Sequence, residues 1–138
     1  METVILFNVI YDYHSLCKDV KNLDKKIRFV GVINERGRLV ACEIKENSHI
    51  INEKDEEMLF MELALRVRMR REFEDRLGKV KYSMTIREGL VGVNVPIKTD
   101  CLYVATEPEV NLTELPLKII KTIKNQETSQ KKIVTFQN

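Results

Sequence analysis

Residues 53–77 constrain the fold more than any other stretch, because their apolar side chains fall on two opposite sides of a helix. At about 100° per residue, one stripe contains Met58, Met61, Leu65, Met69 and Phe73. A second stripe, nearly opposite, contains Phe60, Leu63 and Val67. A helix that lies on a sheet needs only one apolar stripe. The other must therefore be covered by the helix near the N-terminus or by another subunit.

Capping signals flank this stretch. Asn52 is a good N-cap, and acidic residues follow it in the first turn. Gly78 comes directly after the last apolar residue and favours the left-handed conformation that ends many helices. The sequence therefore predicts one helix from about residue 53 to Leu77.

An amphipathic helix is predicted earlier in the chain, over residues 2–23. Its apolar residues recur every three or four positions, at Leu6, Val9, Tyr13, Leu16, Val20 and Leu23. Three heptads are the lower limit for a coiled coil. We therefore expect this helix to pack on its own domain in preference to a coiled coil.

Between the two helices the pattern indicates a β-hairpin. Residues 27–33 carry apolar side chains on both faces, which is typical of a strand covered on both sides. The segment Asn34 to Gly37 has turn chemistry, and Gly37 can adopt a positive φ. Residues 38–44 return as a second strand. Gly31, inside the first strand, indicates a bulge or a close approach.

After Gly78 the apolar period changes to two, which indicates strands. Residues 80–86 and 91–97 alternate in this way, and residues 101–106 are apolar on both faces. Pro96 cannot donate a hydrogen bond to a ladder, so we expect it at a strand end or an edge. These three segments predict a meander.

A final helix is predicted to begin near Asn111 or Thr113, with Pro116 in its first turn. From Asn125 onward the chain is polar, and we expect a mobile tail in which "KIVTF" could pair as a strand. The chain is predicted to form a single α+β domain over residues 1–124, followed by the tail 125–138. The expected fold is a five-stranded antiparallel sheet with helices packed on it, in the order α-ββ-α-βββ-α.

Two segments on either side of the long helix carry a family resemblance. "IRFVGVINERGRLVA" and "GKVKYSMTIREGLVGVNVPIKTDCLYVAT" resemble the hairpin and the meander of the roadblock/dynein light chain superfamily, which is close to the longin and profilin-like folds. The resemblance lies in the pattern and covers about residues 9–124. The segments "KIRFVGVINERGRLV" and "MRREFEDRLGKVKYS" also resemble an uncharacterised family of small archaeal proteins, chiefly from ammonia-oxidising lineages.

The roadblock resemblance implies a function. Such proteins are typically homodimers or heterodimers that bind small GTPases or act as scaffold subunits. Their dimers commonly join sheets edge to edge and pair the long helices. The chain is thus expected to be a non-enzymatic dimeric protein-interaction module, with Phe60, Leu63 and Val67 as candidate interface residues. No GTPase-binding signature carries over residue by residue.

A second hypothesis is a small-ligand sensor of profilin-like or PAS-like type. Its pocket would lie between the sheet and the helices, lined by Met69, Tyr82, Met84 and Tyr103. A sensor needs an apolar cavity of roughly a few hundred Å³ with a few polar groups. A dimeric module needs Phe60, Leu63 and Val67 buried across a two-fold axis instead.

The residue types that commonly act in catalysis or bind metals are not arranged in any recognisable motif in this sequence. No phosphate loop, dinucleotide fingerprint or Gly-x-Ser-x-Gly motif is present. Cys17, Cys42, Cys101, His14 and His49 lack the spacing of a zinc site. We therefore expect no enzymatic activity, no cofactor and no metal, and we expect reduced thiols in a cytoplasmic protein.

Charge and hydropathy argue against nucleic acid and membrane as partners. The net charge of +2 is far from that of a protein built to coat nucleic acid. The arginines of residues 66–76 are interleaved with acids, and Glu62 to Arg66 is a favourable i, i+4 pair. A solvated helix surface is therefore favoured over a nucleic-acid site. No apolar run approaches the roughly 18 residues of a membrane span, so no membrane is expected.

Overall fold

The computed structural model describes residues 11–46 and 52–136, with residues 128–136 described by their backbone alone. The helices are α1 (Tyr13–Lys21), α2 (Glu53–Arg71), α3 (Glu74–Leu77) and α4 (Leu115–Phe136). The strands are β1 (Ile27–Ile33), β2 (Leu39–Ile44), β3 (Ser83–Ile86), β4 (Val91–Ile97) and β5 (Asp100–Thr106). The predicted α+β class and its element order are confirmed.

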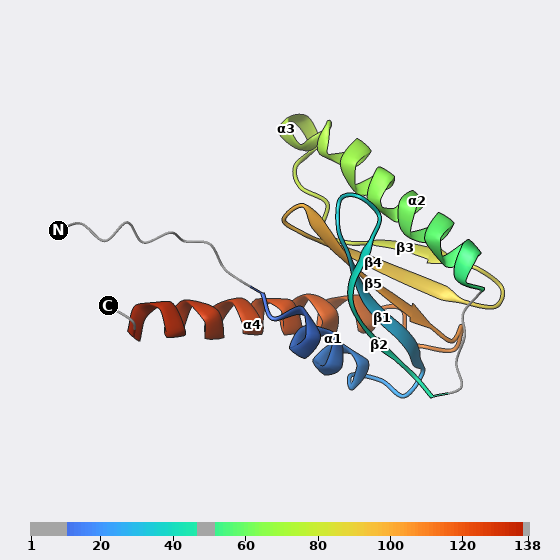
Figure 1. Cartoon of the computed structure of the whole chain (residues 1–138), viewed down its shortest axis with the longest axis horizontal. Helices are drawn as coiled ribbons and strands as arrows, with labels where there is room; N and C mark the ends of the chain where they lie inside the picture. Colours follow the sequence, from blue (N-terminus) through green and yellow to red (C-terminus); the bar gives the residue numbers. More distant parts are fainter. Residues whose placement is uncertain (1–10, 47–51, 137–138) are drawn as a thin grey trace.

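The strands form one antiparallel sheet in the order β2-β1-β5-β4-β3 (Figure 1). The N-terminal hairpin and the meander join through β1 and β5, which are distant in sequence. This pairing places β1, β5 and most of β4 in the interior, and their residues are nearly all buried. It leaves β2 and β3 as the two edge strands.

Helices cover the two faces of the sheet unequally. Helices α1 and α4 lie side by side on one face, and α2 crosses the other face (Figure 1). The α1/α4 face holds the larger core cluster, which includes Leu16, Val30, Leu102 and Ile119. The α2 face holds a smaller cluster built around Phe29, Phe60 and Tyr103.

The hairpin turn has the predicted chemistry. Gly37 has a φ of +76°, and Asn34 accepts hydrogen bonds from the amides of Arg36 and Arg38. A side chain at Gly37 would also collide with Met61, because its Cβ would lie 2.7 Å from the sulfur. The turn therefore lies directly against α2, and glycine is required there for two reasons.

Within β1 the predicted close approach is at Gly31. A Cβ at this position would lie 2.7 Å from the ring of Phe29 and 2.8 Å from the side chain of Leu39. The register of β1 against β5 shifts between Ile27 and Phe29. This bulge moves Ile27 to the α1/α4 cluster, although simple alternation predicts that it shares a face with Phe29.

Three predicted boundaries are corrected. The first helix begins at Tyr13 with Asp12 as its N-cap, and the predicted residues 2–10 lie outside the described residues. The long helix ends at Arg71, because the amides of Glu72 and Phe73 bond to the carbonyls three residues back and tighten the last turn. Residues Glu74 to Leu77 form the separate short helix α3. Gly78 follows this helix with a φ of +84°.

The third correction concerns the C-terminal region. Helix α4 continues to Phe136, through the segment predicted as a polar tail with a strand near its end. It begins at Leu115, after a turn in which Asn111 accepts hydrogen bonds from the amides of Thr113 and Glu114, and Pro116 lies in its first turn as predicted. The segment 125–136 contains no glycine or proline and several good helix formers, so nothing in it ends the helix.

Pro96 lies within β4, which is an inner strand of the sheet. Strand β3 pairs only with residues Val91 to Asn94 of β4. Beyond Asn94 the β3 side of β4 has no neighbour, and Pro96 pairs with Cys101 on the other side. The proline is therefore at a local edge, in agreement with the expectation from its missing N–H.

Candidate interaction surface

Helix α2 is positioned by its N-terminus and its buried stripe. The side chain of Asn52 accepts a hydrogen bond from the amide of Asp55 at 2.9 Å, as the sequence predicts. Phe60, Leu63 and Val67 pack onto β1 and β5, and the rings of Phe29 and Phe60 stack with 6.0 Å between their centroids. Ala64 lies beside them and is also buried.

This packing corrects the predicted position of the interface. Phe60, Leu63 and Val67 were the candidate interface residues, and the protomer itself buries all three to 6–7% exposure. The apolar surface that α2 leaves for a partner is the opposite stripe. The sequence holds a signal that distinguishes the two, because Leu59 and Ala64 widen the buried stripe without charge, whereas Glu57, Glu62 and Arg68 border the other.

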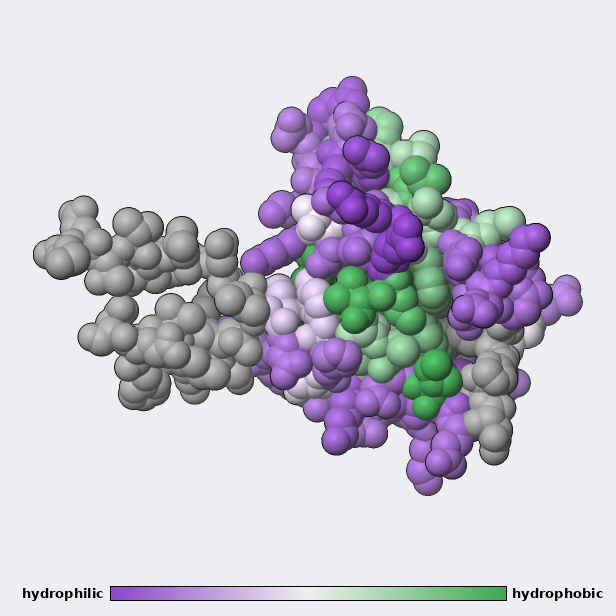
Figure 2. Space-filling model, in the orientation of Figure 1, coloured by the Kyte–Doolittle hydropathy of each residue, from purple (hydrophilic) through white to green (hydrophobic). Residues whose placement is uncertain are grey.

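The outward stripe of α2 is defined by four residues of the helix and by Phe73, which follows its end, and all five have large apolar side chains and high exposure. They are Met58 (69% exposed), Met61 (52%), Leu65 (54%), Met69 (65%) and Phe73 (49%). Hydrophobic side chains are visible along α2 and over the region of β2 in Figure 2. Scattered apolar residues are normal on a protein surface, whereas contiguous exposed apolar patches are typical of interaction sites.

Charges along α2 are separated by position. Glu53, Asp55 and Glu56 lie in the first turn, and Arg68, Arg70 and Arg71 lie in the last. This arrangement suits the helix dipole. Within the helix, Glu62 and Arg66 form the predicted ion pair at 2.8 Å. Of the three basic residues, Arg70 and Arg71 bond to Ser83 and to the carbonyl of Lys98, and Arg68 is exposed beside the outward stripe.

The four residues predicted to line a ligand pocket do not come together. Met69 is exposed on α2, and Tyr82 is partly exposed before β3. Met84 packs against the α1/α4 cluster, whereas Tyr103 is in the α2 cluster on the other face. Met84 lies opposite Val93, and Val93 lies opposite Val104, so the sheet register places Met84 on the face of Val104 and the neighbouring residue Tyr103 on the other face.

The cavity between α2 and the sheet is small. It has a volume of about 30 Å³ and is bordered by Tyr103, Asn94 and Arg70, so it is about the size of one water molecule. Asn94 is buried, and its amide oxygen accepts no hydrogen bond from the described residues. Burial raises the pKa of the Tyr103 phenol. This cavity cannot hold a ligand of the size that a sensor needs.

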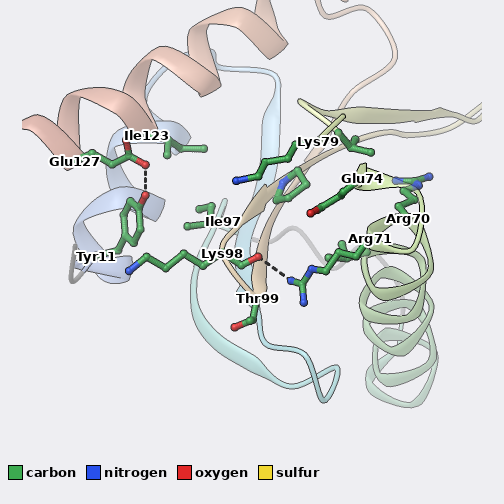
Figure 3. A pocket seen from close by; sticks show the side chains of 13 residues that line it. Tyr11, Arg70, Arg71, Glu74, Lys79, Ile97, Lys98, Thr99, Ile123 and Glu127 are labelled. Carbon is green, nitrogen blue, oxygen red and sulfur yellow. Dashed lines mark hydrogen bonds between the residues drawn. The ribbon is translucent and has the colours of Figure 1, made fainter. Parts of the chain in front are cut away.

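A larger groove lies at the C-terminal end of α2, as Figure 3 shows. Its volume is about 610 Å³. Arg71 donates a hydrogen bond to the carbonyl of Lys98 at 2.7 Å and ties α2 to the β4–β5 turn, where Lys98 has a φ of +53°. Across the groove, Tyr11 donates a hydrogen bond to Glu127, and Lys98 lies over the Tyr11 ring. The groove is wide enough for a small ligand, but it contains none of the four predicted pocket residues.

The thiols and histidines have separate surroundings. Cys17 and Cys101 are buried on opposite faces of the sheet, whereas Cys42 is partly exposed on β2. Burial raises the pKa of both buried thiols to about 12. His14 is exposed on α1, and His49 lies outside the described residues. Across residues 11–46 and 52–136, no group of histidine, cysteine and acidic side chains is arranged to hold a metal ion.

Comparison with known families identifies the chain. A family described as a family of unknown function, DUF6659, matches residues 6–131. The chain belongs to this family. No curated protein matches the sequence of this DUF6659 protein. Among its described residues, no helix is both long and apolar enough to cross a membrane.

Solved structures show that the DUF6659 protein has a roadblock-like fold. The gliding protein MglB from Thermus thermophilus matches with a TM-score of 0.66 and 9% identity, over 94% of this chain and 95% of that one. A Roadblock/LC7 domain from Streptomyces avermitilis matches with a TM-score of 0.63 and 12% identity, over 83% and 93%. Schizosaccharomyces pombe profilin matches with a TM-score of 0.56 and 11% identity, over 81% and 93%. At these identities the likeness is one of fold.

Proposed function

We propose that this protein is a non-enzymatic, homodimeric protein-interaction module that regulates or scaffolds a small GTPase. The observation that carries the proposal is the outward stripe of α2. Five large apolar side chains form one continuous row there, and the protomer's own chain leaves each of them about half exposed or more. Such a row is stable in water when a second apolar surface covers it.

The charges beside the stripe support a second copy of the chain as that surface. In an antiparallel pair of α2 helices, the acidic first turn of each helix lies beside the exposed Arg68 of the other. Arg70 and Arg71 bond to Ser83 and Lys98 of their own protomer. A two-fold axis near Leu65 then places Met61 beside Met69 of the partner subunit. The same residues serve on both sides, as a two-fold interface requires.

The fold supports the GTPase part of the proposal. Roadblock-like proteins are typically dimers that bind small GTPases, and the neighbours in structure space include Roadblock/LC7 and MglB proteins. The small cavity under α2 argues against a ligand sensor built on the predicted pocket residues. The groove beside Lys98 leaves room for a ligand elsewhere.

The dimer is tested by the variant Leu65→Glu. A charge at the centre of the stripe should reduce the solution mass, measured by light scattering, from two chains per particle to one. The matched control is Leu117→Glu on α4, which changes an apolar residue of similar exposure (61%) away from the stripe. An unchanged mass for Leu65→Glu, with native circular dichroism, contradicts the proposed interface.

The partner is tested with purified small GTPases encoded by the same genome and loaded with GTP. We expect the wild-type protein to bind one of them in titration calorimetry and to change its rate of nucleotide hydrolysis or exchange. Leu65→Glu should weaken binding if the dimer presents the GTPase site. If none of the GTPases binds and no rate changes, the GTPase role is excluded while the dimer still stands.

A further inference from the structure

The groove at the C-terminal end of α2 is open because strand β3 ends before it. Strand β3 pairs with β4 only as far as Asn94, so none of the described strands lies along the outer side of Pro96. Proline has no amide N–H, so this side of β4 leaves no donor there without a partner. The volume of about 610 Å³ beside the end of β4 is therefore accessible to an added molecule, and it is within the range of roughly 300–1,000 Å³ that small-molecule sites have.

Apolar side chains from both faces of the sheet line this groove. They are Val67, Val80, Pro96, Ile97 and Ile123. Val67 belongs to the core cluster on the α2 face, whereas Ile97 and Ile123 belong to the α1/α4 cluster. Val80 and Pro96 are half-buried and add apolar surface that water still reaches. An apolar group in the groove would remove this surface from water, which is favourable.

The charged side chains of the groove are mostly basic. Four bases and two acids line it: Arg70, Arg71, Lys79, Lys98, Glu74 and Glu127. Figure 3 shows the two arginines and Glu74 on the α2 side, Glu127 across from them, and the two lysines between. A cleft in which one sign of charge is in excess attracts ions of the opposite sign. The charge of this groove therefore favours an anion.

Two of the bases are held in position by the protein itself. Arg70 donates a hydrogen bond to the hydroxyl of Ser83 at 2.8 Å, and Arg71 donates one to the carbonyl of Lys98 at 2.7 Å. A guanidinium group has five N–H donors in a fixed plane, so both arginines keep donors for an anion. On the far side, the Lys98 ammonium lies 5.8 Å from the centre of the Tyr11 ring. These contacts fix the positive groups before a ligand binds.

A small organic anion matches both the apolar and the basic side chains of the groove. We propose that this groove binds such a molecule, with its apolar body against Val80 and Ile97 and its carboxylate or phosphate group among Arg71, Lys79 and Lys98. Hydrogen bonds between an ionised donor and an ionised acceptor are roughly twice as strong as neutral ones. None of the lining residues belongs to the outward stripe of α2, so the site does not depend on the proposed dimer.

A pair of related dyes tests the site. Anilinonaphthalene sulfonate has an aromatic body and a negative charge, and N-phenylnaphthylamine has nearly the same body without the charge. In fluorescence titrations we expect the sulfonate to bind the wild-type protein more tightly than the neutral dye. Lys79→Glu with Lys98→Glu should weaken binding of the sulfonate by about tenfold or more and leave binding of the neutral dye unchanged.

Two control variants locate the bound dye. Lys18→Glu with Lys25→Glu changes the net charge equally, at two exposed lysines that do not line the groove. Leu65→Glu changes the outward stripe, where an apolar dye could also bind. Both controls should keep the wild-type affinity for the sulfonate. The proposal is wrong if the variant at Lys79 and Lys98 has native circular dichroism and binds the sulfonate as tightly as the wild type, or if Leu65→Glu abolishes binding instead.

Competition on the wild-type protein identifies the anionic group and needs no variant to fold. Phenylpropanoate and phenyl phosphate each join an aromatic ring to an acidic group, and phenylpropanol is the uncharged match of the first. We expect both anions to displace the sulfonate dye, and the one that does so at the lower concentration shows which acidic group the groove prefers. The alcohol should displace little. Equal displacement by phenylpropanol and phenylpropanoate would overturn the assignment of an anion.

Discussion

The two faces of the sheet are covered in different ways. On one face, α1 and α4 pack together and bury residues such as Leu16, Val104 and Ile119 completely. On the other face, α2 lies alone, and its contact residues Phe60, Leu63 and Val67 keep 6–7% exposure. The α2 face also leaves β2 partly exposed at the edge of the sheet and presents a second apolar stripe to the solvent. The protomer itself covers the first face, whereas the second face leaves apolar side chains exposed to the solvent.

We expect the two faces of the sheet to differ in how easily they open locally, as well as in their interfaces. A layer made of one helix has fewer buried apolar contacts to lose than a layer made of two. Local opening has a lower free-energy cost where fewer contacts are buried. We therefore expect the α2 layer to open before the α1/α4 layer.

The largest expected effect is in thiol labelling, because each face buries one cysteine. Cys42 should react with Ellman's reagent quickly, and both buried thiols should react on the order of a hundredfold more slowly or less, since they need local opening. Cys101 on the α2 face should then react before Cys17. Mass spectrometry of the labelled peptides gives the order. Labelling of Cys17 first would reverse the comparison of the two faces.

Because the pKa values of the two buried thiols are raised, the free energy of unfolding should depend on pH. Both folded-state pKa values are about 12 because of burial, whereas an unfolded cysteine ionises at about 8.5. Above that pH the unfolded chain binds fewer protons than the native one, so the free energy of unfolding should fall as pH rises from about 8.5 towards 12. Urea unfolding of the wild type and of Cys17→Ala at a series of pH values measures the slope. A slope that Cys17→Ala leaves unchanged would exclude a contribution from that thiol.

Truncation in the two-helix layer should have the next largest effect. Ile119→Ala on α4 removes a fully buried side chain, and we expect it to lower the free energy of unfolding by about 2–5 kcal/mol. Leu117→Ala, on the exposed side of the same helix, should change it by about 0.5 kcal/mol or less. Chemical denaturation compares the two. Equal effects would show that α4 does not pack as the core of this face.

A smaller effect is expected from crowding the α2 face. Gly31→Ala places a Cβ 2.7 Å from the Phe29 ring, and overpacking of this kind costs about 1–3 kcal/mol. The control is Gly89→Ala, where an added Cβ has no atom within 4 Å. Thermal unfolding of both variants measures the difference. A neutral Gly31→Ala would mean that the layer under α2 is loose enough to shift.

The smallest effect compares the two N-caps. Asn52→Ala and Asp12→Ala each remove one side-chain acceptor, at the start of α2 and of α1. Each should lower the free energy of unfolding by about 1 kcal/mol. Hydrogen exchange should show that Asn52→Ala speeds opening of α2 alone, because that layer opens independently. Equal acceleration over the whole chain would instead show one cooperative unit.

The fold was predictable from the sequence because its signals are local. The two-residue period of the meander, the turn at Gly37 and the cap at Asn52 each depend on nearby backbone geometry. The end of α2 was not predictable in this way. It depends on bonds to the carbonyls three residues back, and Arg71 is held by the carbonyl of Lys98, which is 27 positions away in sequence.

The candidate site was only half predictable. The sequence determined that α2 has two opposed apolar stripes, since helical spacing alone places Phe60 and Leu65 on different sides. Only the tertiary structure decided which stripe meets the sheet and that β2 remains an open edge. Both depend on how β1 pairs with β5 and where α2 crosses them. Those contacts join residues far apart in the chain, and no local spacing encodes them.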